Sequence, residues 1–129
     1  MTAILGKNWK SPDLALLLLR IALGVIFIAH GWDKIQNMQA TIGFFATLGF
    51  SSFFAYLVAY VEFLGGLAVL LGVCMRQATL ALAVIMVFAI YLIKAYKGLL
   101  GGYEIDLMLL ATALALSILG PGKWRILSK

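Results

Sequence analysis

Four long apolar segments dominate the chain, and short stretches richer in polar residues and glycine separate them. The segments cover approximately residues 13–34, 53–73, 78–97 and 104–120. A helix needs about 20 apolar residues to cross the hydrocarbon core of a bilayer, so each segment is long enough to span it. The pattern predicts an all-α integral membrane protein, an antiparallel four-helix bundle that forms a single domain over the whole chain.

Residues typical of helix ends bound the first and last segments. Ser11 is suited to cap the first helix, Pro12 to its first position, and Asp13 to the positive end of its dipole. Gly120 and Pro121 both oppose continuation of the last helix. The first segment lacks the small-residue cleavage site of a secretory signal peptide, so we expect it to be a membrane span.

The loop between the first two segments, M-Q-A-T-I-G-F-F-A-T-L-G-F, carries no charge and is rich in aromatic residues. It is too short to cross a bilayer. Two interpretations remain open: a short helix that lies in the outer interface or folds back into the membrane, and a hydrophobic loop that rests on lipid.

Composition supports a membrane environment. Apolar residues make up 64% of the chain and charged residues 12%, about half the share of charged residues in globular proteins. The mean hydropathy is +1.08. Nothing in the sequence resembles a basic, aromatic nucleic-acid surface, and the single cysteine, Cys74, excludes an intrachain disulfide and a cysteine-rich metal site.

The distribution of basic residues predicts the orientation of the bundle. With four spans, both termini and the second loop lie on the same side of the membrane. That side carries Lys7, Lys10, Arg76, Lys123, Arg125 and Lys129. The opposite side carries only Lys34, Lys94 and Lys97. The excess predicts cytoplasmic termini, and Trp9 and Trp124 at the inner interface with Trp32 at the outer one agree with it.

Two charged residues fall inside the spans, where ionisable groups are costly and mark functional candidates. Arg20 is two turns into the first span, roughly 10 Å from its start, and Glu62 is near the middle of the second. If the helix ends are level, their depths differ by only about 5 Å. We therefore predict that Arg20 and Glu62 form an ion pair.

The only histidine of the chain, His30, lies at the outer end of the first span, where other polar residues also gather. This outer group comprises His30, Asp33, Lys34, Lys94, Glu104 and Asp106. His30 can titrate near neutral pH and exchange protons with a ligand, bind a metal, or hydrogen-bond a neighbouring helix. Because no metal-ligand spacing accompanies it, we expect no protein-bound metal, and no nucleotide-binding motif is found.

Glycines follow the acid of the second span. Gly65 and Gly66 lie one turn after Glu62 and allow a helix or a flat ligand to approach the backbone closely. Close helix packing and a ligand site therefore both remain open for these two positions.

Four motifs together resemble the DoxX family. They are R-I-A-L-G-V-I-F-I-A-H-G-W-D-K, G-F-F-A-T-L-G, E-F-L-G-G-L-A-V-L-L-G, and G-Y-E-I-D-L with L-G-P-G-K-W. The resemblance covers roughly residues 16–124, and the matched positions include Arg20, Gly24, His30, Gly31, Lys34, Glu62, Gly65, Gly66, Gly72 and Glu104. The chain departs from the family in W-R-I-L-S-K after G-P-G, where many relatives have Ser-Leu-Asp after an aromatic residue.

The resemblance implies a small four-helix protein of the bacterial or archaeal inner membrane, related to a subunit of thiosulfate:quinone oxidoreductase. Two functions follow as hypotheses. In the first, the chain is a subunit of a quinone-linked oxidoreductase that binds a hydrophobic redox ligand within the bundle and takes electrons from a partner protein. In the second, it is a non-catalytic module that holds a lipid, a small hydrophobic molecule or a partner membrane protein. Formation of a homo-oligomer is a separate expectation that the sequence leaves open. Candidate ligand-binding or proton-exchange residues are Arg20, His30, Lys34, Glu62, Gly65, Gly66, Lys94 and Glu104.

Overall fold

The computed structural model describes residues 11–125, and within them the chain is almost entirely helical and contains no strand. Four helices are long and apolar enough to span a membrane. The α-helices are α2 (Pro12–Gln36), α3 (Met38–Thr47), α4 (Ser52–Leu71), α5 (Met75–Ala89) and α6 (Glu104–Leu119). The predicted four-helix architecture and the short helix in the first loop are confirmed. Lys7, Trp9, Lys10 and Lys129, which entered the orientation argument, lie outside the described residues.

The third span continues beyond α5 and then reverses sharply into the fourth. After α5 the chain forms a π-helical turn, η2 (Ile90–Lys94), and a short 3-10 turn, η3 (Ala95–Lys97). Gly98 has a φ of +77° and ends the span. The next turn, η4 (Leu99–Tyr103), contains a kink before α6 begins.

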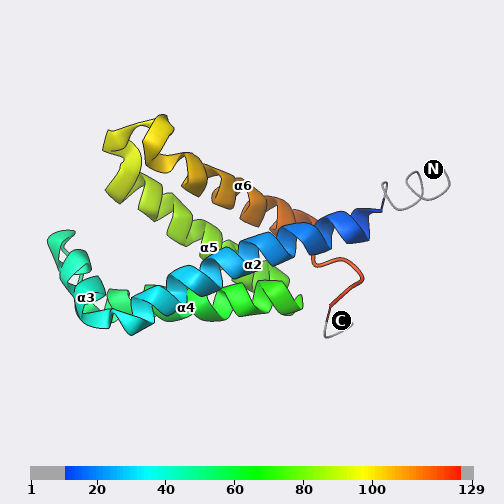
Figure 1. Ribbon diagram of the computed structural model, residues 1–129, viewed down its shortest axis with the longest axis horizontal. Helices are drawn as coiled ribbons and strands as arrows, with labels where there is room; N and C mark the ends of the chain where they lie inside the picture. The colour runs from blue at the N-terminus through cyan, green and yellow to red at the C-terminus, as the bar shows by residue number, and fades with distance from the viewer. Residues whose placement is uncertain (1–10, 126–129) are drawn as a thin grey trace.

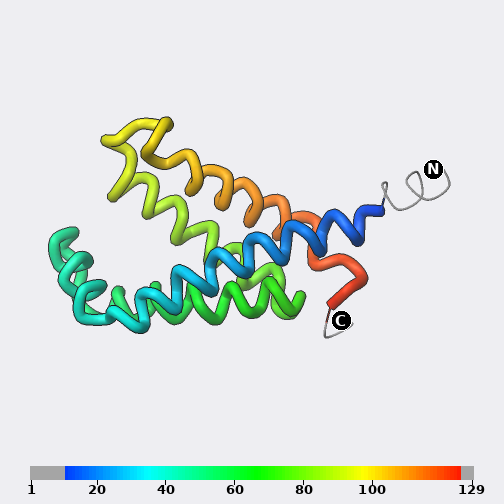
Figure 2. The backbone as a smooth tube through the Cα atoms, viewed as in Figure 1, coloured from blue at the N-terminus to red at the C-terminus, as the bar shows by residue number. Residues whose placement is uncertain are grey.

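The four long helices form two hairpins, one of α2 and α4 and one of α5 and α6 (Figure 1). The hairpins meet where α2 and α5 begin and α4 and α6 end, which we call the closed end. They diverge toward α3 and the η2–η4 turn, which we call the open end (Figure 2). The helices of each hairpin contact each other more extensively than they contact the other hairpin, most clearly for α2 and α4.

Close contact between backbones holds the first hairpin together. A Cβ atom on Gly24 would lie 2.9 Å from the carbonyl oxygen of Gly66, and one on Gly66 would lie 2.7 Å from the amide nitrogen of Ile28. A Cβ atom on Gly31 would collide with the backbone of Phe63. Small residues at such contacts allow helices to pack in lipid, where the hydrophobic effect supplies little driving force between helices.

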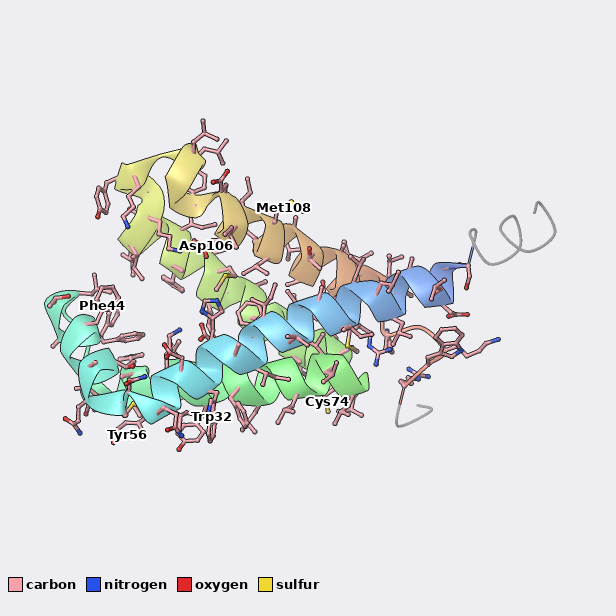
Figure 3. The ribbon with its side chains drawn as sticks, in the orientation of Figure 1. Trp32, Phe44, Tyr56, Cys74, Asp106 and Met108 are labelled. Carbon is pink, nitrogen blue, oxygen red and sulfur yellow. The ribbon has the colours of Figure 1, made fainter. Side chains whose placement is uncertain are left out.

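Both hairpins contribute to one apolar core. From the first come Leu23, Phe27 and Val69, each almost fully buried, and from the second Leu82 and Leu116. Many large apolar side chains lie on the outside instead, and Figure 3 shows Met108 projecting away from the bundle, with 67% of its surface exposed. This distribution is expected when lipid surrounds the helices.

Candidate functional site

Arg20 is the most deeply buried charged residue of the described chain, with only 1% of its surface exposed. Its guanidinium donates to carbonyl oxygens alone. Nε bonds Val69 O at 2.9 Å and Nη2 bonds Leu70 O at 2.8 Å. Nη1 bonds Pro121 O at 3.0 Å and also Trp124 O. Arg20 thus links α2, the end of α4 and the segment that follows α6.

The end of α4 explains how this charge is accommodated without an acid. The last carbonyl groups of a helix lack intrahelical partners and carry the negative end of its dipole, so a cation there is favourable. Gly72 follows with a φ of +79°, and a Cβ atom at this position would lie 2.6 Å from Arg20 Nη2. Glycine is therefore required at this position both by the backbone conformation and by the space that Arg20 occupies.

The predicted ion pair between Arg20 and Glu62 is wrong. It assumed that α2 begins level with the end of α4, whereas α2 begins well beyond that point (Figure 1). Arg20 is level with Leu70, because the two are hydrogen-bonded, and Glu62 is eight residues, or about 12 Å, closer to the open end.

Glu62 pairs with Lys34 instead. Lys34 Nζ lies 2.8 Å from Glu62 Oε1, and the exposed fractions of the two side chains are 25% and 4%. The pair joins α2 to α4 near the open end. The sequence placed both residues among the candidates but gave no indication that they were partners.

A second ion pair joins the helices of the other hairpin. Lys94 Nζ lies 2.9 Å from Asp106 Oδ2, with exposed fractions of 36% and 10% for the two side chains. Lys94 ends the π-helical turn η2, and Asp106 lies in the first turn of α6. Asp106 belongs to the predicted outer group but not to the candidate ligand-binding or proton-exchange residues predicted from the sequence. An acid on the apolar face of the last span was the signal that could have singled it out.

His30 and Glu104 are both exposed, in different settings. The His30 side chain makes no hydrogen bond or ion pair with the described residues. It lies three residues after Phe27 and four before Lys34, so it shares one side of α2 with both. Glu104 Oε1 accepts a hydrogen bond from Gly101 N at 3.1 Å, which ties it to its own turn.

The glycines after Glu62 are occupied by helix packing. Gly66 lies against the backbone of α2, and a Cβ atom on Gly65 would meet the side chain of Leu82 on α5 at 3.2 Å. There is consequently no room for a flat ring between α2 and α4 at Gly66. Arg20, Glu62 and His30 line neither of the two pockets described next.

The two pockets lie near the start of α5. One, of about 330 Å³, is bounded by the α4–α5 turn, the first residues of α5, the end of α6 and the segment after it. The other, of about 350 Å³, is an apolar groove along α4 and α5. No group of three or more potential metal ligands occurs among residues 11–125.

The helices and their lipid-facing surface define a multi-pass membrane protein whose intramembrane charges are bound by other parts of the chain. A family model described as DoxX matches residues 15–95. The chain belongs to the DoxX family, which confirms the resemblance noted in the sequence.

Three relatives support this assignment. The chain is 38% identical to "Putative oxidoreductase CatD" of Bacillus subtilis, over 86% of this chain and 83% of the relative. It is 30% identical to "Inner membrane protein YqjF" of Escherichia coli, over 91% and 92%. It is 31% identical to "Uncharacterized membrane protein Rv3486" of Mycobacterium tuberculosis, over 84% and 76%. No solved structure matches the chain.

Proposed function

We propose that this protein is a membrane subunit of a quinone-linked oxidoreductase, and that the quinone ring binds at the open end beside His30. The observation that carries the proposal is the setting of His30. An exposed imidazole without a partner among the described residues lies one helical turn from the Lys34–Glu62 ion pair. Intramembrane groups of this kind typically take part in proton exchange.

The apolar side of α2 leads to this position. Leu23 and Phe27 contact the core that both hairpins share, and His30 continues the same side toward the open end. The hairpins diverge there (Figure 2), so His30 remains uncovered while Phe27 is buried. A quinone ring beside His30 would lie between the apolar residues that precede His30 on α2 and the Lys34–Glu62 ion pair that follows it.

Quinone reduction takes up protons as well as electrons, so a titratable donor beside the ring oxygens is what the reaction needs. His30 would supply a proton to a ring oxygen, and the neighbouring Lys34–Glu62 pair would stabilise the changing charge of the imidazole. The electrons would come from a partner protein. The name of the Bacillus relative, which includes "oxidoreductase", supports this class of function for that protein.

The proposal includes an inner-membrane location with the closed end in the cytoplasm. Arg76, Lys123 and Arg125 lie near the closed end, and the positive-inside rule favours that side for them. The inner-membrane name of the Escherichia relative agrees with this location.

A non-catalytic binding or assembly module is the second candidate. The observation that favours it is the packed interior of the first hairpin, where Gly24 and Gly66 bring the two backbones into contact. In this case the lipid-facing pockets, and not His30, would bind the ligand.

Photoaffinity labelling tests the proposal. The protein is reconstituted in nanodiscs with a photoreactive azidoquinone, and labelled peptides are identified by mass spectrometry. We expect labelling around His30 on α2, displacement by excess unmodified quinone, and a severalfold decrease in His30→Ala. Val25→Ala, an exposed α2 position, is the matched control and should label normally.

Two results would contradict the quinone site. Labelling that excess quinone does not displace would show non-specific contact with lipid-dissolved reagent. Displaceable labelling confined to the groove of α4 and α5, unaffected by His30→Ala, would move the ligand to another surface and support the binding module.

A further inference from the structure

A basic pocket and an apolar groove adjoin at the closed end, and the proposed quinone site uses neither of them. Arg76 and Arg125 line the basic pocket, together with the polar residues Gln77 and Ser117. None of the described residues that line it is acidic. The pocket is therefore suited to an anion.

The groove differs in character but shares a wall with the basic pocket. It runs along α4 and α5 between residues such as Leu57, Leu64 and Ala81, and its lining within residues 11–125 is uncharged. Cys74 and Gln77 line both the pocket and the groove. The basic pocket, of about 330 Å³, and the apolar groove, of about 350 Å³, are therefore adjacent.

The basic wall is held in place from two sides. Arg20 binds the carbonyl oxygens of Pro121 and Trp124, and Asp13 Oδ1 accepts a hydrogen bond from Lys123 N at 2.9 Å. These contacts fix the segment after α6, which contributes Arg125 to the pocket. On the opposite wall the first turn of α5 contributes Arg76, and the N-terminus of this helix adds partial positive charge.

From this juxtaposition we propose that the closed end binds one anionic phospholipid, with its phosphate between Arg76 and Arg125 and an acyl chain in the groove of α4 and α5. Basic pockets between spans at the membrane surface recognise anionic headgroups. A neutral quinone ring offers the two guanidinium groups only uncharged carbonyl acceptors, whereas a phosphate forms stronger bonds between opposite charges. The apolar groove, which a free phosphate would leave empty, favours the lipid as the source of the anion.

Native mass spectrometry of the delipidated full-length protein tests the headgroup. The protein is titrated separately with dioleoyl phosphatidylglycerol and dioleoyl phosphatidylcholine. We expect one tight phosphatidylglycerol adduct and much weaker binding of phosphatidylcholine. Arg76→Gln and Arg125→Gln should each weaken phosphatidylglycerol binding by about fivefold, the effect of one basic residue at a membrane surface. Lys97→Gln, which removes the same charge at the open end, should leave binding unchanged.

The acyl chain is tested by filling the groove. Ala81→Trp should weaken phosphatidylglycerol binding severalfold, whereas Val84→Trp, an exposed position one turn further along α5, should not. Cys74 provides an independent readout, because its exposed thiol lies at the junction of the two pockets. Bound phosphatidylglycerol should slow its reaction with N-ethylmaleimide, and Arg76→Gln should abolish that protection.

Three outcomes would overturn the proposal. Equal affinity for the two lipids would exclude headgroup recognition. Full displacement by millimolar inorganic phosphate, with no effect of Ala81→Trp, would make this a site for a free anion. Equal losses of phosphatidylglycerol affinity in Lys97→Gln and Arg76→Gln would show that binding depends only on the net charge of the protein. Quinone labelling at the open end is independent of all three.

Discussion

The two ends of the bundle bind their charged groups in different ways. At the closed end one guanidinium, that of Arg20, bonds four carbonyl oxygens from α4 and from the segment after α6. At the open end each hairpin contains its own ion pair, Lys34–Glu62 or Lys94–Asp106. No ion pair of the described residues joins the two hairpins at the open end.

This difference indicates that the two hairpins are held together at the closed end and can move apart at the open end. The partners of Arg20 are main-chain atoms of two separate segments, so its bonds resist separation of these segments. The open-end pairs are satisfied within a hairpin, so they persist whether or not the hairpins move apart. This arrangement suits a tied closed end and an open end that can admit a ligand.

The largest predicted effect follows from removing Arg20. Arg20→Ala leaves buried carbonyl groups of α4 without their hydrogen-bond donor. Because these acceptors belong to the main chain, no second substitution can remove them and relieve the loss. We expect a loss of about 2–5 kcal/mol of unfolding free energy. Thermal or SDS unfolding in detergent measures it, and Trp124 fluorescence reports release of the segment after α6.

Arg20→Lys is the informative companion to this variant. It keeps the charge but loses the planar fork that reaches several carbonyl groups at once. We expect it to recover only part of the stability. Wild-type stability for Arg20→Ala would show that the closed end is not held by this residue.

The second largest effect is expected where the backbones of α2 and α4 touch. Gly31→Ala forces a methyl group against the backbone of Phe63, so the helices must shift apart. We expect a loss of about 1–3 kcal/mol, typical of overpacking, measured by the same unfolding assays. Gly43→Ala is the matched control, because its Cβ atom meets nothing within 4 Å, and alanine in a helix should stabilise by roughly 0.5–1 kcal/mol. Equal effects of the two substitutions would contradict tight packing within this hairpin.

Most of the fold could be predicted from the sequence because hydropathy and helix-end residues are local signals. Ser11, Pro12 and Gly120 mark helix ends where they were expected, and Ser11 caps α2 through a hydrogen bond to Leu14 N. The aromatic loop does contain a short helix. The second span ends at Leu71, slightly earlier than predicted, because Gly72 adopts a positive φ.

The candidate site was harder to predict because it depends on the relative depth of the helices. Hydropathy does not determine how far α2 extends beyond the end of α4. Because α2 starts well beyond that point, Glu62 lies beside Lys34 and not beside Arg20. The π-helical turn likewise changes the direction of Lys94 in a way that no periodicity indicates. The candidate residues could therefore be selected from the sequence, but their pairing could not.

A smaller loss of unfolding free energy is expected at the Lys34–Glu62 pair, where the effects of substituting the two residues should not be additive. Glu62→Gln leaves the ammonium of Lys34 without its partner, at a cost of about 1–2 kcal/mol, because Lys34 is one quarter exposed and reaches water. The double variant Lys34→Gln/Glu62→Gln should recover much of this loss, with a coupling energy on the order of 1 kcal/mol. Arg20→Gln combined with Glu62→Gln should instead be additive. A coupling between Arg20 and Glu62 would restore the ion pair that the structure excludes.

The smallest effect is expected at Lys94. More than a third of its side chain is exposed, so its ammonium can reach water when its partner is lost, and Asp106→Asn should cost no more than about 0.5 kcal/mol. Because the contact lies within the second hairpin, hydrogen exchange should increase only in η2 and the first turn of α6, and the closed end should keep its protection. A loss as large as that of Arg20→Ala, or faster exchange at Pro121–Trp124, would mean that the open end also holds the hairpins together. That result would remove the distinction between a tied end and an end that can open.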